Sequence, residues 1–153
     1  MKIIDDIQIL TGKKKDPRFI SNEPPPKVVL IVEDEKPLAN ILATRLQEEG
    51  FHVLKAFNGE DGLALTIANK PDIIILDLLM PILDGKSMLR KLRESPEHKH
   101  IPVIVLTNAG EIENARETQF YSDAIEFLIK SNVTMDQIVA KVKMHTLTTP
   151  FAS

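Results

Sequence analysis

Short apolar runs alternate with longer segments of helical spacing from Lys27 onward. In the longer segments apolar residues recur three and four positions apart, which is the spacing of an amphipathic helix. Runs that are apolar at consecutive positions indicate strands buried on both faces, the habit of a parallel sheet covered by helices. The pattern therefore predicts an α/β fold with a doubly wound, five-stranded parallel sheet and helices on both faces. We expect strands at 28–32, 51–57, 73–76, 102–107 and 125–129.

Local signals mark where the helices begin and end. Gly50 stands where a helix C′ glycine is preferred, Asn58-Gly59 is typical of a turn, and Thr134 with Gln137 three residues on predicts a capping box. The expected apolar faces are Leu38, Ile41, Leu42 and Leu46; Leu63, Ala64, Ile67 and Ala68; Met88, Leu89 and Leu92; Ile112, Ala115 and Phe120; and Ile138, Val139 and Val142.

Three consecutive prolines, Pro24 to Pro26, divide the chain. They favour a stiff, extended connector. We therefore expect an N-terminal extension over 1–26, one domain over 27–147 and a short tail over 148–153. The extension is either a solvated, partly disordered tail or a segment that docks on a partner.

Composition excludes several classes of protein. The net charge of −3 argues against a nucleic-acid-binding protein, and the absence of cysteine excludes disulfides and Cys-ligated metals. No apolar run has the length of a membrane span, and the acidic N-terminus is unlike a signal peptide, so we expect a cytoplasmic protein. The four histidines, at 52, 98, 100 and 145, suggest solvated surface and no metal site.

Polar residues follow the ends of four predicted strands. Glu33 and Asp34 follow the first strand and Asp77 the third, while Thr107 and Lys130 mark the ends of the fourth and fifth. Parallel strands bring these ends to one edge of the sheet, where ligands bind. Three carboxylates there suit a hard cation such as Mg²⁺. Asp77 is also a potential nucleophile toward phosphorus, and Thr107 and Lys130 can neutralise phosphoryl oxygens.

The strings VLIVEDE, IIILDLLMPILDG, IPVIVLTN and AIEFLIK carry these residues. Together they resemble the receiver domain of two-component response regulators, in particular the single-domain chemotaxis type, from about residue 27 to 147. The resemblance implies the flavodoxin-like strand order 2-1-3-4-5.

The resemblance also implies the roles of the acids. Asp77 would accept a phosphoryl group from a sensor histidine kinase or a phosphotransfer protein. Glu33, Asp34, Asp77 and the main-chain carbonyl of Leu79 would bind Mg²⁺. The protein would then be a phosphoprotein that catalyses at most its own phosphoryl transfer and dephosphorylation, and not an enzyme acting on other substrates.

Two further residues would contact the phosphoryl group, namely Thr107 and Lys130. Phe127 matches the aromatic residue whose rotation is coupled to Thr107 in the family's switch. The resulting change would reach an unidentified downstream protein through the face of helix 4, strand 5 and helix 5. Both a monomer and a phosphorylation-dependent dimer agree with the sequence.

Some positions depart from the family pattern. Ser131 replaces the usual proline, so the Lys130–Ser131 bond is either trans, in a rebuilt loop, or an uncommon cis bond. Asp123 replaces a common glycine. Leu79 and Ala109 cannot orient an attacking water, so we expect slow self-dephosphorylation. Pro81 and Gly85 are expected to be structural.

The leading hypothesis is a stand-alone, phosphorylation-controlled signalling module. An alternative is an adaptor or scaffold with the same fold that signals by binding alone. A phosphatase of similar architecture is disfavoured, since such aspartate-nucleophile enzymes carry a second acid where this chain has Leu79.

Overall fold

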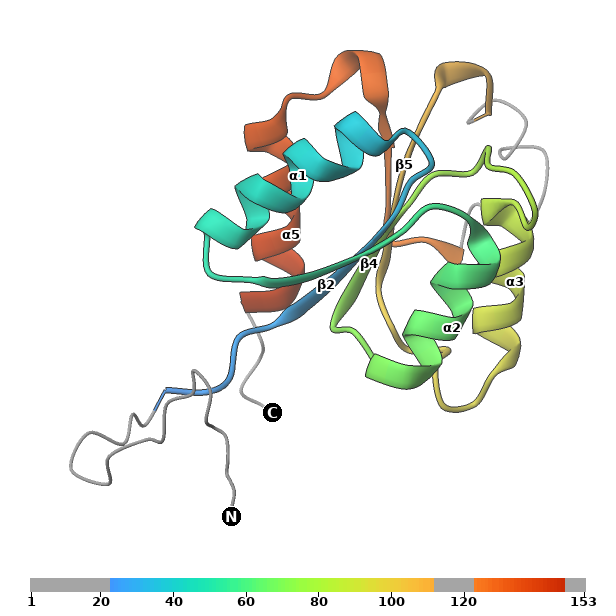
Figure 1. Cartoon of the computed structure of the whole chain (residues 1–153), viewed down its shortest axis with the longest axis horizontal. Coiled ribbons are helices and arrows are strands. Elements are labelled where there is room, and N and C mark those ends of the chain that lie inside the picture. The colour runs from blue at the N-terminus through green and yellow to red at the C-terminus, as the bar shows by residue number, and fades with distance from the viewer. Residues whose placement is uncertain (1–22, 112–122, 148–153) are drawn as a thin grey trace.

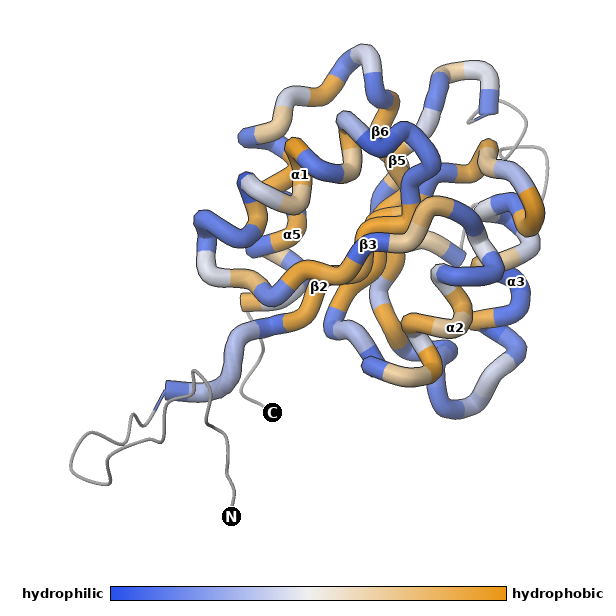
Figure 2. The backbone as a smooth tube through the Cα atoms, in the orientation of Figure 1, coloured by the Kyte–Doolittle hydropathy of each residue, from blue (hydrophilic) through white to orange (hydrophobic). Residues whose placement is uncertain are grey.

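The computed structural model describes residues 23–111 and 123–147. Within them five parallel strands form one sheet in the order β3-β2-β4-β5-β6, which is the predicted order 2-1-3-4-5. Figure 2 shows these strands as a hydrophobic centre, in agreement with the buried apolar runs of the sequence. The strands are β2 (Val28–Val32), β3 (His52–Ala56), β4 (Ile73–Leu76), β5 (Val103–Thr107) and β6 (Glu126–Ile129).

Helices cover both faces of the sheet (Figure 1). Helices α1 and α5 pack on one face and α2 and α3 on the other, so the core consists of two apolar layers separated by the sheet. The expected fourth helix, with Ile112, Ala115 and Phe120, lies outside the described residues, as do the N-terminal segment before Glu23 and the tail after Leu147. The helices are α1 (Lys36–Glu48), α2 (Gly59–Asn69), α3 (Gly85–Glu94), α5 (Met135–Leu147) and the 3₁₀ helix η3 (Lys130–Asn132).

Several predicted helix ends are confirmed. Gly50 has φ +99°, the left-handed conformation expected of a C′ glycine. The capping box is formed: the Thr134 N–H donates to Gln137 Oε1 at 2.9 Å, and the Gln137 N–H donates to Thr134 Oγ1 at 3.1 Å. Asn58-Gly59 is the start of α2 and not a separate turn, because Asn58 Oδ1 accepts from the Asp61 N–H and caps the helix.

The predicted apolar face of α2 is confirmed only for Leu63, which packs against the core; the other three residues of that face are exposed. Ile67 is 62% exposed, and the helix turns Gly62 and Thr66 toward the sheet instead. A Cβ on Gly62 would lie 3.0 Å from Val32 Cγ2 and 2.9 Å from Met88 Sδ. The small residues therefore let α2 approach β2 and α3 more closely than its larger apolar residues would allow. Ile41 of α1 is likewise 54% exposed, since Ala39 and Ala43 pack inward.

Candidate active site

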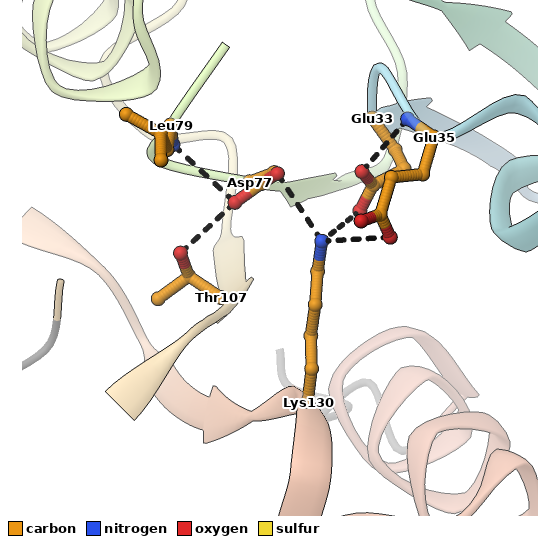
Figure 3. Close-up of polar contacts among 6 residues, drawn as sticks. All are labelled: Glu33, Glu35, Asp77, Leu79, Thr107 and Lys130. Atoms are coloured by element: carbon orange, nitrogen blue, oxygen red, sulfur yellow. Dashed lines mark hydrogen bonds and ion pairs between the residues drawn. The ribbon is translucent and has the colours of Figure 1, made fainter. Parts of the chain in front are cut away.

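The strand register brings the predicted site residues to one edge of the sheet. Val32 pairs with Leu76 in the β2–β4 ladder, so Glu33 and Asp77 follow at the same level. The next ladders place Thr107 at the end of β5 and Lys130 directly after β6. Figure 3 shows their side chains pointing toward one another.

Asp77 is the centre of this cluster. Its side chain is only 4% exposed. Oδ1 accepts hydrogen bonds from Thr107 Oγ1 at 2.9 Å and from the Leu79 N–H at 3.3 Å, and Oδ2 accepts from Lys130 Nζ at 3.2 Å. The Thr107 hydroxyl and the Lys130 ammonium are thus both positioned beside the carboxylate that is predicted to react.

The loop between β4 and α3 is held closely against the site. The Gly85 N–H donates to the Leu78 carbonyl at 2.9 Å, and a Cβ on Gly85 would lie 2.2 Å from the Asp77 carbonyl oxygen. The Gly59 N–H donates to the Leu83 carbonyl at 2.9 Å. These contacts fix a loop in which Ile82 has φ +71°, a costly conformation for a β-branched residue. Gly85 therefore has the structural place predicted for it.

Lys130 is the counter-cation of the cluster. Its Nζ lies 2.9 Å from Glu33 Oε1, 3.2 Å from Asp77 Oδ2 and 3.4 Å from Glu35 Oε1 (Figure 3). Burial works to lower the pKa of Lys130, but hydrogen bonds and charges from Glu33 and Asp77 outweigh it and raise this pKa above its usual value. Lys130 is therefore fully charged at neutral pH.

Burial has the opposite consequence for Glu33. It raises the pKa of this carboxyl to about 7, although the hydrogen bond from Lys130 works to lower it. One lysine does not compensate the whole set of acids. The site therefore holds an excess of negative charge that a further cation would neutralise.

The donor set fits a hard divalent cation. Carboxylate oxygens of Glu33, Asp34 and Asp77 all lie within 4.8 Å of one another. Asp34 and Asp77 border a cavity of about 340 Å³, which Leu79 also lines. Oxygen-only donors with room for water are what Mg²⁺ prefers. Leu79 lies on this cavity, and its carbonyl stays a predicted ligand.

Three residues at the site are not predicted from the sequence. Glu35 contacts Lys130, and Met80 and Asn108 line the cavity. The signal for Glu35 was present, because it is the third acid of the Glu33-Asp34-Glu35 run.

Ser131 and Asp123, two positions that depart from the family pattern, are both described by the structure. The Lys130–Ser131 bond is trans, and the chain turns there through η3. The main-chain carbonyl of Asp123 accepts from Arg93.

The expectation of solvated histidines is wrong for His98. This residue is buried, and its Nδ1 lies 2.8 Å from Ser95 Oγ, which fastens the loop after α3. Among the described residues, the side chains that could hold a metal ion together include no histidine.

Comparison with known proteins agrees with this geometry. Residues 29–143 match the family model of the response regulator receiver domain. Within residues 23–111 and 123–147, the helices lack the length and apolar character that crossing a membrane requires.

Solved receiver domains share the fold. The receiver domain of the Francisella response regulator 1452 is 30% identical over 79% of this chain and 97% of its own, with a TM-score of 0.70. The Thermotoga maritima response regulator TrrA, solved in complex with Mg²⁺–BeF, is 31% identical over 78% of this chain and 98% of its own, with a TM-score of 0.67. The signal receiver domain of a Syntrophus aciditrophicus histidine kinase is 29% identical over 83% and 95%, with a TM-score of 0.73. The chain belongs to the response regulator receiver domain family.

Proposed function

We propose that this protein is a phosphorylation-controlled signalling protein whose Asp77 accepts a phosphoryl group from the phosphohistidine of a kinase or phosphotransfer protein. The observation that carries the proposal is the placement of Asp77, buried and hydrogen-bonded to both Thr107 and Lys130, beside two further acids at an open cavity. The complex of the related TrrA with Mg²⁺–BeF supports the proposal, since that structure holds Mg²⁺, the cation proposed for this site, together with beryllofluoride.

The transfer is a displacement at phosphorus. A carboxylate oxygen of Asp77 forms the new P–O bond while the P–N bond to the donor imidazole breaks, and the imidazole nitrogen keeps the electron pair. Thr107 donates its hydroxyl, and Lys130 its ammonium protons, to phosphoryl oxygens. Both groups already contact Asp77, so short side-chain movements suffice.

Glu33, Asp34 and Asp77, with the carbonyl of Leu79, would hold Mg²⁺. When bound, the ion supplies charge neutralisation for the phosphoryl oxygens. The chain's own acids are then no longer a repulsive barrier to an anionic phosphoryl donor.

Acetyl phosphate with Mg²⁺ tests the proposal directly. Intact-protein mass spectrometry should show the gain of one phosphoryl group in the wild type and none in Asp77→Asn. The matched control is Asp72→Asn at the opposite end of β4, where the acid is exposed and far from the cavity; this variant should gain the group normally.

Two outcomes contradict the proposal. A wild type that gains no mass favours the alternative of an adaptor that signals by binding alone. A gain that persists in Asp77→Asn places the modification elsewhere. Chelation of Mg²⁺ before acetyl phosphate is added should also prevent the gain.

The proposed output is a change passed to a protein partner. Thr107 is fully buried and bonded to Asp77, while Phe127 is partly buried against the α2–α3 side of the sheet. Movement of Thr107 toward a phosphoryl group would alter the space available to Phe127. Beryllofluoride should therefore shift the NMR resonances of the Phe127 ring, and Thr107→Ala should weaken that shift.

A further inference from the structure

The Glu35 side chain contacts Lys130 and does not cap the helix that begins after it. Glu35 is the N-cap residue of α1, and its side chain makes no capping hydrogen bond. Its backbone is nevertheless fixed, because its N–H donates to Glu33 Oε2 at 3.1 Å and its carbonyl accepts from the Ala39 N–H. Short polar residues are preferred at this position because they cap the helix. The Glu35 carboxylate reaches Lys130 instead (Figure 3).

Lys130 has no spare donor in this arrangement. An ammonium group carries three N–H bonds. Three carboxylates surround it, those of Glu33 at 2.9 Å, Asp77 at 3.2 Å and Glu35 at 3.4 Å. A hydrogen bond from Lys130 to a phosphoryl oxygen must therefore replace one of these three contacts.

Exposure identifies the contact that is given up. The side chains of Glu33 and Asp77 are each 4% exposed, so loss of the lysine would leave a buried carboxylate without its counter-charge. The Glu35 side chain is 62% exposed, and water replaces the lysine there at little cost. The Glu35 contact is also the longest of the three.

We infer that Glu35 is a positioning residue of the phosphoryl transfer: it occupies on Lys130 the place that a phosphoryl oxygen takes, and it must release Lys130 before transfer. This inference rests on the proposed function of Asp77. Glu35 acts through Lys130 and not on the cation, since it is not among the acids whose oxygens lie within 4.8 Å of one another.

The decisive comparison separates the hydrogen bond from the charge. Glu35→Gln removes the ionic contact, and Glu35→Asp keeps the charge on a side chain one methylene shorter. Both should be phosphorylated by acetyl phosphate about two- to fivefold faster than the wild type, the range expected for loss of one exposed ion pair. Glu60→Gln, an exposed acid in the first turn of α2, makes the same change in net charge and should leave the rate unchanged.

A binding measurement gives a readout that is independent of the chemical step. Beryllofluoride, which mimics the phosphoryl group, should bind Glu35→Gln more tightly than the wild type by a similar factor. The affinity for Mg²⁺ alone should change less than twofold. Glu35→Ser adds a capping side chain, so it should raise the melting temperature and also speed phosphorylation, which excludes general loosening of the fold as the cause.

Each result is decisive. A wild type that never gains a phosphoryl group overturns the proposed function itself. A phosphorylated wild type whose rate and beryllofluoride affinity equal those of Glu35→Gln overturns only the role of Glu35. A normal rate in Glu35→Asp combined with a faster Glu35→Gln would replace the hydrogen-bond role by a general effect of charge.

Discussion

Strand β4 carries an aspartate at each end, and the two are held in different ways. Asp72, before the strand, is exposed; its Oδ2 accepts from the Val28 N–H at 2.7 Å, and its own N–H donates to the Val28 carbonyl. Asp77, after the strand, is buried among Thr107, Lys130 and further acids. The same residue type thus serves chain pairing at one end of the sheet and an ionic cluster at the other.

The difference extends to the neighbouring groups. Near the amino ends of β5 and β6, Arg93 donates to the carbonyls of Lys99, Ile101 and Asp123, so its charge is spread over main-chain acceptors that have no charge of their own. At the carboxyl ends, several carboxylates share one ammonium group. We propose that the first end stabilises the fold, while the second has the charge and the space to take up a cation and a phosphoryl group.

Replacement of Arg93 tests the stabilising end and should have the largest effect. Arg93→Met removes the donor of three carbonyls, of which those of Ile101 and Asp123 accept it in partly buried hydrogen bonds, and we expect the free energy of unfolding to fall by about 3 kcal/mol. Urea denaturation measures it, with Lys91→Met on the exposed side of α3 as the control. Phosphorylation of the folded protein should be unchanged. A loss below about 1 kcal/mol would contradict the assignment.

Gly85→Ala tests whether the loop between β4 and α3 affects both the stability of the fold and the phosphorylation of Asp77. The added Cβ would meet the Asp77 carbonyl oxygen at 2.2 Å, so the backbone that presents Asp77 must shift. We expect a loss of about 2 kcal/mol in stability and slower phosphorylation of the protein that remains folded. Gly110→Ala is the control, since a Cβ there meets nothing within 4 Å. Equal behaviour of the two variants would show that the loop yields freely.

The carboxyl groups at the carboxyl ends of the strands should make the affinity for Mg²⁺ depend on pH. Because burial raises the pKa of Glu33 to about 7, this carboxyl is mostly protonated at pH 6 and must lose its proton to bind a cation. Calorimetric titration should show about tenfold weaker affinity at pH 6 than at pH 8. Glu33→Gln should bind weakly at both values, and a wild type with constant affinity would contradict the prediction.

The change in stability with pH that Glu33 causes has the opposite sign to that of an ordinary carboxylate. Without a metal ion, the folded protein holds the Glu33 proton more tightly than the unfolded chain, whose pKa is near 4.5. Stability contributed by this group is present below pH 4.5 and is lost as the pH rises to about 7. The metal-free protein should therefore melt at a lower temperature at pH 8 than Glu33→Gln does.

The sheet and most of the site were predictable from the sequence because their signals are local. Runs such as Ile73 to Leu76 are apolar at every position, and the parallel arrangement then brings Asp77, Thr107 and Lys130 to one edge. The strand order needed the family resemblance, since alternation of strands and helices alone permits other orders.

The errors arose where tertiary contacts decide. The hydrophobic pattern of α2 points to Ile67, but the close approach that Gly62 permits depends on Met88 from another helix. Glu35 contacts Lys130, which lies 95 positions away in the sequence, and its side chain makes no capping hydrogen bond at the start of α1. No rule based on sequence spacing predicts such a contact. The burial of His98 likewise depends on a loop whose path the sequence does not specify.

The smallest expected effect concerns two apolar residues beside the acidic cluster, Leu79 and Ala109, which we call the apolar rim. Leu79 borders the cavity and Ala109 is exposed two residues beyond Thr107; neither side chain can hydrogen-bond a water that attacks the phosphoryl group. The double variant Leu79→Asn, Ala109→Glu supplies such groups and leaves Lys130 and Thr107 in place. It should lose its phosphoryl group about fivefold faster than the wild type, as followed by intact mass after donor removal with Mg²⁺ present.

Equal rates of loss would show that the Asp77 phosphoryl group is protected by something other than its apolar rim. The same substitutions should leave Mg²⁺ affinity unchanged, because the substitution at Leu79 retains the main-chain carbonyl and Ala109 is not among the proposed ligands. A faster loss combined with unchanged Mg²⁺ affinity would assign the lifetime of the phosphorylated state to the rim, and the capacity to form that state to the acids beneath it.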